Sequence, residues 1–127
     1  MEIYGIGNDI IEISRIKNAI IKNIKFINRI FTDNEINYAK TKKDIYATYS
    51  GRFSAKEAFY KAMGTGILTY GFNDIEILND KNGKPYLNIL NLNLKKYIDE
   101  EKLYIHLTIS HSKENAIATV LITKKRS

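Results

Sequence analysis

Hydrophobic positions recur along the chain with two periods, and these periods predict helices mainly in the first half and strands at the start and in the second half. The Ile-rich stretch 3–13 predicts a buried strand. Apolar residues then recur at helical spacing from Ile16 to Ile27, and basic residues lie mostly off that stripe, so we expect one amphipathic basic helix. The pattern TDNE at 32–35 is a capping box and predicts a short helix that ends near Lys42.

The longest helix is expected from about Ile45 to Met63. Small residues at helical spacing form a narrow stripe along it: Ala47, Gly51, Ala55, Ala58 and Ala62. Such a stripe would let another element pack closely against the helix. Gly64 is well suited to end the helix because glycine accepts the left-handed backbone conformation.

The second half of the chain predicts short strands joined by turns. Strands are expected at 74–78 and 86–90, and Asn82-Gly83 between them is the strongest hairpin signal in the chain. The remaining elements are a short polar helix within 91–102 and a strand pair at 104–110 and 116–122. Without a repeat or a linker, residues 1–127 are expected to form a single α+β domain, with a mostly antiparallel sheet packed against the long helix.

Composition narrows the class of protein. The chain has 127 residues, of which 44% are hydrophobic, enough for one domain with its own core. No apolar run approaches the roughly 18–20 residues needed to cross a bilayer, and no secretory signal pattern is found. The absence of cysteine excludes disulfides, thiolate catalysis and Cys-ligated zinc, and a cytoplasmic protein is the simplest interpretation.

The net charge of +6 favours an acidic partner, such as nucleic acid, a phosphorylated ligand, an anionic membrane or an acidic protein. Compositional drift is the alternative, because the basic residues are spread along the chain and Ile, Asn, Lys and Tyr are heavily used.

Asp9 is the first candidate for chemistry. It shares its side of the predicted strand with Ile11 and Ile13, which are positions of the kind that point inward. A carboxylate there needs a partner or a metal ion. Gly5 and Gly7 lie on the same side and suggest open space beside Asp9. The alternative is an acidic residue that caps a turn at the strand end.

Glu57 and Lys61 are four residues apart and therefore share one face of the long helix. They could form an exposed ion pair of little energetic consequence. Alternatively, Asp9 and Glu57 could hold one Mg²⁺ ion, which takes one or two protein carboxylates and completes its shell with water and phosphate oxygens. Lys61 would then offset further phosphate charge.

His111 ends an apolar strand face, on the same side as Ile109, whereas His106 falls on the opposite side. It could be a structural histidine, or it could donate to a phosphate together with Ser110 and Ser112. A hydrolase triad is unsupported because the chain has no Gly-x-Ser-x-Gly elbow.

Five segments together resemble holo-[acyl-carrier-protein] synthase, the family of short 4′-phosphopantetheinyl transferases. They are 5-GIGNDIIEISR-15, 29-RIFTDNE-35, 52-RFSAKEAFYKAMGTG-66, 74-DIEILNDKNGKPYL-87 and 107-LTISHSKENAIATV-120. The resemblance covers nearly the whole chain in the family's order. It implies transfer of the 4′-phosphopantetheine group from coenzyme A (CoA) to a serine of apo acyl carrier protein, in fatty acid biosynthesis.

The resemblance also implies roles for individual residues. Asp9 and Glu57 would bind Mg²⁺, or Mn²⁺ in its place, together with the CoA pyrophosphate. Glu57 could also be the base for the serine, directly or through a water. Lys61 would stabilise the leaving phosphate. His111 corresponds to the family histidine near the pyrophosphate, and the implied catalytic set is Asp9, Glu57, Lys61 and His111. The implied CoA-binding set is Arg52, Lys61, Gly64, Gly66, Ser110 and His111. In this interpretation the long helix presents Arg52, Glu57 and Lys61 to the phosphates as one wall.

The family further implies a homotrimer with active sites between subunits. Arg15 and Lys22, on the basic helix, correspond to the region that docks the acidic carrier protein. Residues 91–102 have no specific match. A basic nucleic-acid-binding module is the alternative from another class, and a structural trimer without activity is a third. We expect neither nucleic acid nor membrane as a partner, because no RNA- or DNA-binding motif appears and both carboxylates would be without purpose.

Overall fold

The structure is a computed structural model that describes residues 1–64 and 69–126. A three-stranded antiparallel sheet has the order β1 (Glu2–Glu12), β5 (Asn115–Lys124), β4 (Leu103–His111). A separate antiparallel pair consists of β2 (Ile75–Asn79) and β3 (Pro85–Ile89). The predicted α+β class with antiparallel strands is confirmed.

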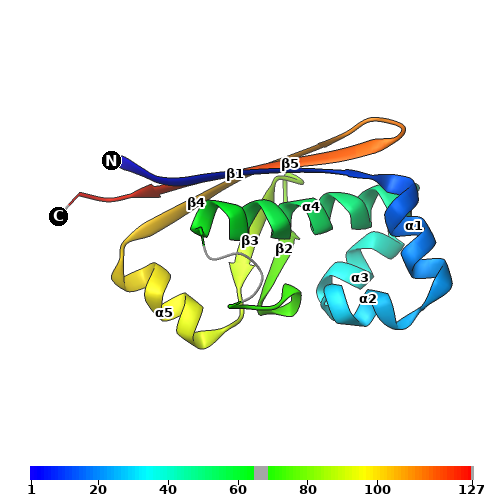
Figure 1. Ribbon diagram of the computed structural model, residues 1–127, viewed down its shortest axis with the longest axis horizontal. Helices are drawn as coiled ribbons and strands as arrows, with labels where there is room; N and C mark the ends of the chain where they lie inside the picture. Colours follow the sequence, from blue (N-terminus) through cyan, green and yellow to red (C-terminus); the bar gives the residue numbers. More distant parts are fainter. Residues whose placement is uncertain (65–68, 127) are drawn as a thin grey trace.

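The long helix α4 (Ile45–Met63) runs along one face of the larger sheet, and the β2–β3 pair packs against both α4 and β4 (Figure 1). The other helical elements are α1 (Ile13–Lys22), α2 (Lys25–Ile30), α3 (Asp33–Lys40), η1 (Phe72–Asp74) and α5 (Leu92–Glu100). The bounds of α4 agree with the prediction. Gly64 ends it with φ +77°, and its N–H donates to the carbonyls of Tyr60 and Lys61.

The small-residue stripe of α4 lies against the two glycines of β1. A Cβ placed on Gly5 would come within 1.9 Å of the Ala62 carbonyl oxygen, and one on Gly7 within 1.9 Å of that of Ala58. The predicted close packing is therefore confirmed. The prediction of open space beside Asp9 is wrong, because the backbone of α4 fills that space.

The single basic helix expected around Ile16 to Ile27 is also wrong, because the chain turns at Asn23. Asn23 is extended (φ −151°, ψ 103°), and its side-chain Oδ1 accepts from the backbone N–H of Lys25, which separates α1 from α2. Ile16 and Ile20 are buried, but the break changes the helical phase and leaves Ile24 69% exposed.

The capping box at the start of α3 is present. The Glu35 backbone N–H donates to Thr32 Oγ1, and the Thr32 N–H donates to Glu35 Oε1 at 3.0 Å. Unlike an ordinary surface cap, Glu35 is completely buried. Within the described residues, no helix is both long enough and apolar enough to cross a membrane.

Candidate functional site

Asp9 and Lys61 meet where β1 crosses the last turns of α4. Lys61 Nζ lies 3.2 Å from Asp9 Oδ1 and 3.0 Å from the backbone oxygen of Asn8. Lys61 therefore reaches across to the strand, and the simple exposed pair with Glu57 along the helix is not what the structure describes. Asp9 points toward α4, as its predicted parity required, and its side chain is 15% exposed.

The carboxylate of Glu57 belongs to the same cluster. Burial raises its pKa, the negative charge of Asp9 raises it further, and Lys61 acts in the opposite direction. The two carboxylates are thus close enough to repel each other, and a cation would relieve that repulsion.

The residues present fit Mg²⁺. No cluster of three or more His, Cys, Asp or Glu side chains that could hold a metal occurs in residues 1–64 and 69–126. An ion at Asp9 and Glu57 would take two hard oxygen ligands from the protein and the rest from water or a phosphate. This is the usual coordination of Mg²⁺ at phosphoryl-transfer sites.

Arg52 lies in a different place, in a cavity of ≈ 270 Å³. Its guanidinium stacks 4.2 Å above the ring of Tyr38 and donates from one Nη to Asn79 Oδ1. The side chain is 5% exposed, and its Nε has no hydrogen-bond partner. Lys42 and His111 also line this cavity, so it carries two cationic side chains and a histidine and suits an anion.

The single wall formed by Arg52, Glu57 and Lys61 is therefore wrong for one chain. Arg52 and Lys61 are nine residues apart, which is about half a turn around a helix and roughly 13 Å along its axis. Arg52 faces α3 and β2, whereas Lys61 faces β1. Each chain carries two half-sites on opposite sides of α4: a carboxylate half-site (Asp9, Glu57, Lys61) and an anion half-site (Arg52, Lys42, His111).

Ser110 does not join His111 in one chain. Consecutive residues of β4 point to opposite faces. Ser110 pairs with Ile117, which lies on the outer face of the sheet, whereas His111 lines the Arg52 cavity. Gly64 is at the exposed end of α4 beside Lys61, and Gly66 lies outside the described residues.

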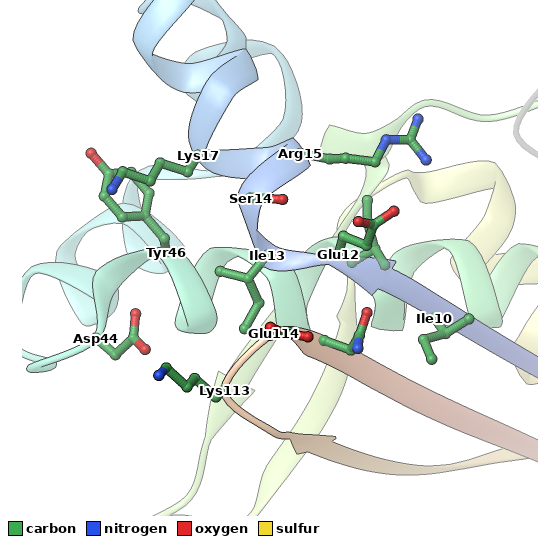
Figure 2. Close-up of a pocket in the computed structure, with 12 residues that line it drawn as sticks. Ile10, Glu12, Ile13, Ser14, Arg15, Lys17, Asp44, Tyr46, Lys113 and Glu114 are labelled. Atoms are coloured by element: carbon green, nitrogen blue, oxygen red, sulfur yellow. The ribbon is translucent and has the colours of Figure 1, made fainter.

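A cavity of ≈ 850 Å³ lies between the start of α1, the start of α4 and the turn that joins β4 to β5. Arg15 lines it and extends away from α1, whereas Lys17 bends over the ring of Tyr46 at 5.5 Å (Figure 2). Acidic residues share the lining, among them Glu12 and Asp44, so it is not a uniformly basic pocket. Lys22, the other predicted docking residue, is exposed at the end of α1 and does not line this cavity.

Sequence reasoning missed three residues around Arg52 and one buried ion pair. Tyr38 and Lys42 come from the end of α3 and the turn after it, and Asn79 comes from the end of β2. These residues have no motif of their own. The pair is Lys56 with Glu35, 2.6 Å apart and both 0% exposed. Its only signal was a lysine flanked by small and aromatic residues of α4.

Comparison with known proteins identifies the class to which this fold and these half-sites belong. The family model of the 4′-phosphopantetheinyl transferase superfamily matches residues 5–120, and the chain belongs to that superfamily.

Within it, the chain is similar to holo-[acyl-carrier-protein] synthases over nearly its whole length. It is 48% identical to the enzyme from Clostridium tetani over 120 residues. The alignment covers 94% of this chain and 95% of the relative. The crystal structure of the Bacillus anthracis synthase in complex with CoA (3′,5′-ADP) matches with a TM-score of 0.82 and 43% identity, over 98% of this chain and 100% of that one. The Helicobacter pylori synthase in complex with coenzyme A matches with a TM-score of 0.80 and 30% identity, over 93% and 99%.

Proposed function

We propose that the chain carries out holo-[acyl-carrier-protein] synthesis with Mg²⁺ at a site assembled from two subunits. Its reaction is transfer of the 4′-phosphopantetheine group from CoA to a serine of apo acyl carrier protein, with adenosine 3′,5′-bisphosphate as the second product. The observation that carries the proposal is the meeting of Asp9, Glu57 and Lys61 in a chain 48% identical to such a synthase. The nucleic-acid-binding alternative has no support in the comparisons.

The chemistry is phosphoryl transfer, so positioning and neutralisation of charge account for most of the catalysis. Lys61 holds a positive charge where the leaving phosphate of CoA would develop negative charge. Glu57 accepts the proton of the attacking serine, directly or through a water, and its raised pKa makes it a better base than an ordinary glutamate. Bound Mg²⁺, or Mn²⁺ in its place, would be held by Asp9 and Glu57 and would neutralise pyrophosphate oxygens.

The position of the half-sites on opposite sides of α4 supports a site between subunits. One chain would supply the carboxylate half-site, and its neighbour would supply Arg52 and His111 for the nucleotide end of CoA. Crystal structures of relatives with CoA or its 3′,5′-ADP part support CoA as the donor.

The uncovered face of the three-stranded sheet supports association of subunits. Ile6 is 67% exposed and Ile10 is 63% exposed on the side of β1 turned away from α4, and Ile117 and Tyr104 extend this surface onto β5 and β4. No helix covers this face in the described part of the chain (Figure 1). Isoleucines at this exposure are typical of a surface buried between subunits, and we assign it to the homotrimer.

The carrier protein would approach Arg15 and Lys22 on α1. The net charge of +6 would steer an acidic partner toward them, an effect that weakens with salt. The absence of cysteine and the role in fatty acid biosynthesis both suit an enzyme of the cytoplasm.

The test is to incubate the protein with apo carrier protein, CoA and Mg²⁺ and to weigh the carrier protein by mass spectrometry. We expect a gain of the phosphopantetheine mass that EDTA abolishes. Asp9→Ala and Glu57→Ala should remain folded and lose the activity. No mass gain with several carrier proteins would refute the function, and full activity of Asp9→Ala at low Mg²⁺ would refute the metal site.

A further inference from the structure

Lys56 and Glu35 form an ion pair in which both side chains are fully buried. The proposed mechanism does not use this pair. Lys56 Nζ donates to Glu35 Oε1 at 2.6 Å, to the Ile30 carbonyl at 2.7 Å and to the Phe72 carbonyl at 2.9 Å. All three hydrogens of the ammonium group are thus used. Glu35 also accepts from the backbone N–H of Thr32 and, through Oε2, from that of Ile77 at 3.0 Å.

A pair of this kind is poor evidence for stability. Removing two charges from water costs about as much as their attraction returns, and replacing both partners by uncharged groups is often tolerated. Loss of one partner alone is harmful because the other charge is left buried. A role in placing its neighbours explains the pair better than a role in stability.

The neighbours are the residues that hold Arg52. Lys56 lies one turn after Arg52 on α4, and Glu35 lies one turn before Tyr38 on α3. Ile77, whose N–H bonds Glu35, lies two residues before Asn79 on the same side of β2. The pair therefore joins α4, α3 and β2 within one helical turn of Arg52 and Tyr38 and two strand residues from Asn79.

The ion pair and Arg52 also interact electrostatically. Burial lowers the pKa of Arg52, and the nearby Tyr38 and Glu35 oppose that shift. Burial likewise lowers the pKa of Lys56, Glu35 opposes this most strongly, and Arg52 adds to the lowering. The ion pair and the anion half-site are thus coupled electrostatically as well as through the backbone.

We propose that Lys56 and Glu35 are positioning residues for the anion half-site: their pair sets the place of Tyr38 and Asn79, hence the orientation of Arg52 and the affinity for the nucleotide part of CoA. This rests on the proposed function, because it takes the Arg52 cavity as the site of that nucleotide.

The test uses the full-length protein and isothermal titration calorimetry with adenosine 3′,5′-bisphosphate. The double variant Glu35→Gln/Lys56→Met removes both charges and keeps an acceptor for the Ile77 N–H. We expect it to bind the nucleotide at least about tenfold more weakly, and to raise the KM for CoA without changing the KM for carrier protein. The control is Leu94→Ala, a buried residue of α5 whose core cluster does not contain Arg52, Tyr38 or Asn79. It should lower the Tm and leave nucleotide affinity within about twofold of the unsubstituted protein.

Two further measurements separate positioning from general loss of structure. In an Asn79→Ala background the double substitution should have little additional effect on nucleotide affinity, because both act through Arg52. Thr32→Ala removes the cap beside Glu35 and the 2.6 Å hydrogen bond from Thr32 Oγ1 to the buried Glu76, which keeps its bonds from Asn34 and Asn88. It should weaken binding by about two- to fivefold and cost too little stability to prevent folding.

Nucleotide affinity within twofold of the unsubstituted protein, in either the double variant or Thr32→Ala, would overturn the inference. So would fully additive losses with Asn79→Ala. Failure of the unsubstituted protein to modify carrier protein would instead refute the proposed function, and that result is read separately from the calorimetry.

Discussion

The contact between Gly7 and α4 offers a sharp test of how the carboxylate half-site is held. In Gly7→Ala the new Cβ would lie 1.9 Å from the Ala58 carbonyl oxygen and 2.7 Å from the Ala62 nitrogen, whereas real Cβ atoms essentially never come within 3.0 Å. Both neighbours are backbone atoms, so no side-chain rotation relieves the overlap. Strand and helix must separate by at least about 1 Å, which is overpacking of a kind that costs about 1–3 kcal/mol of stability.

The same shift moves Glu57 and Lys61 relative to Asp9. A misplacement of about 1 Å costs on the order of 10²-fold in rate where catalysis depends on positioning. We expect Gly7→Ala to lose about 1–3 kcal/mol in urea unfolding at fixed protein concentration. We expect its kcat to fall by about 10²-fold in the mass-spectrometric assay.

Gly71→Ala is the matched control. Among the residues that the structure describes, its Cβ would meet nothing nearer than Asp74 Oδ2 at 3.7 Å, and its backbone φ of −92° suits alanine. It should stay within about 0.5 kcal/mol of the unsubstituted protein. A Gly7→Ala variant as stable and as active as Gly71→Ala would refute the idea that close approach of β1 and α4 sets the site.

Two more predictions concern electrostatics. In metal-free protein, NMR titration should find the pKa of Glu57 above its ordinary value. Asp9→Asn should lower that pKa and Lys61→Met should raise it. Shifts in the opposite directions would contradict the clustering of these three side chains. Because the proposed mechanism needs the ionised form of Glu57, we expect kcat/KM to fall as the pH drops through this raised pKa. Arg15→Glu should raise the KM for carrier protein and weaken the salt dependence of that KM, with no change in the KM for CoA. Lys96→Glu, on the exposed side of α5, should change neither KM. Equal effects of the two variants would refute docking at α1.

Local signals predicted the elements well. The ends of α4 and the capping box at Thr32 depend on residues a few positions apart, and each was found where the sequence placed it. The break at Asn23 was missed because the hydrophobic spacing continues across it. Only the side-chain bond of Asn23 to the next turn's backbone shows why the helix stops there.

The positions of some candidate site residues agree with the prediction and others do not, and helix and strand periodicity explain the difference. Asp9 and Glu57 come together as expected, because parity and helix face were applied to each. The same rules place Ser110 away from His111, and Arg52 half a turn from Lys61. The resemblance had grouped these residues by motif. The Lys56–Glu35 pair joins positions 21 apart, with no local pattern that links them.

The central claim, a catalytic site assembled from two subunits, is tested most directly by mixing two inactive variants. Arg52→Ala lacks the anion half-site, and Glu57→Ala lacks the carboxylate half-site. After the two proteins are unfolded, mixed in equal amounts and refolded together, random assembly should leave about one in four interfaces with both half-sites intact. The account predicts that the mixture adds phosphopantetheine to carrier protein at about a quarter of the unsubstituted rate. A mixture as inactive as each variant alone would contradict it and would place the whole site within one chain.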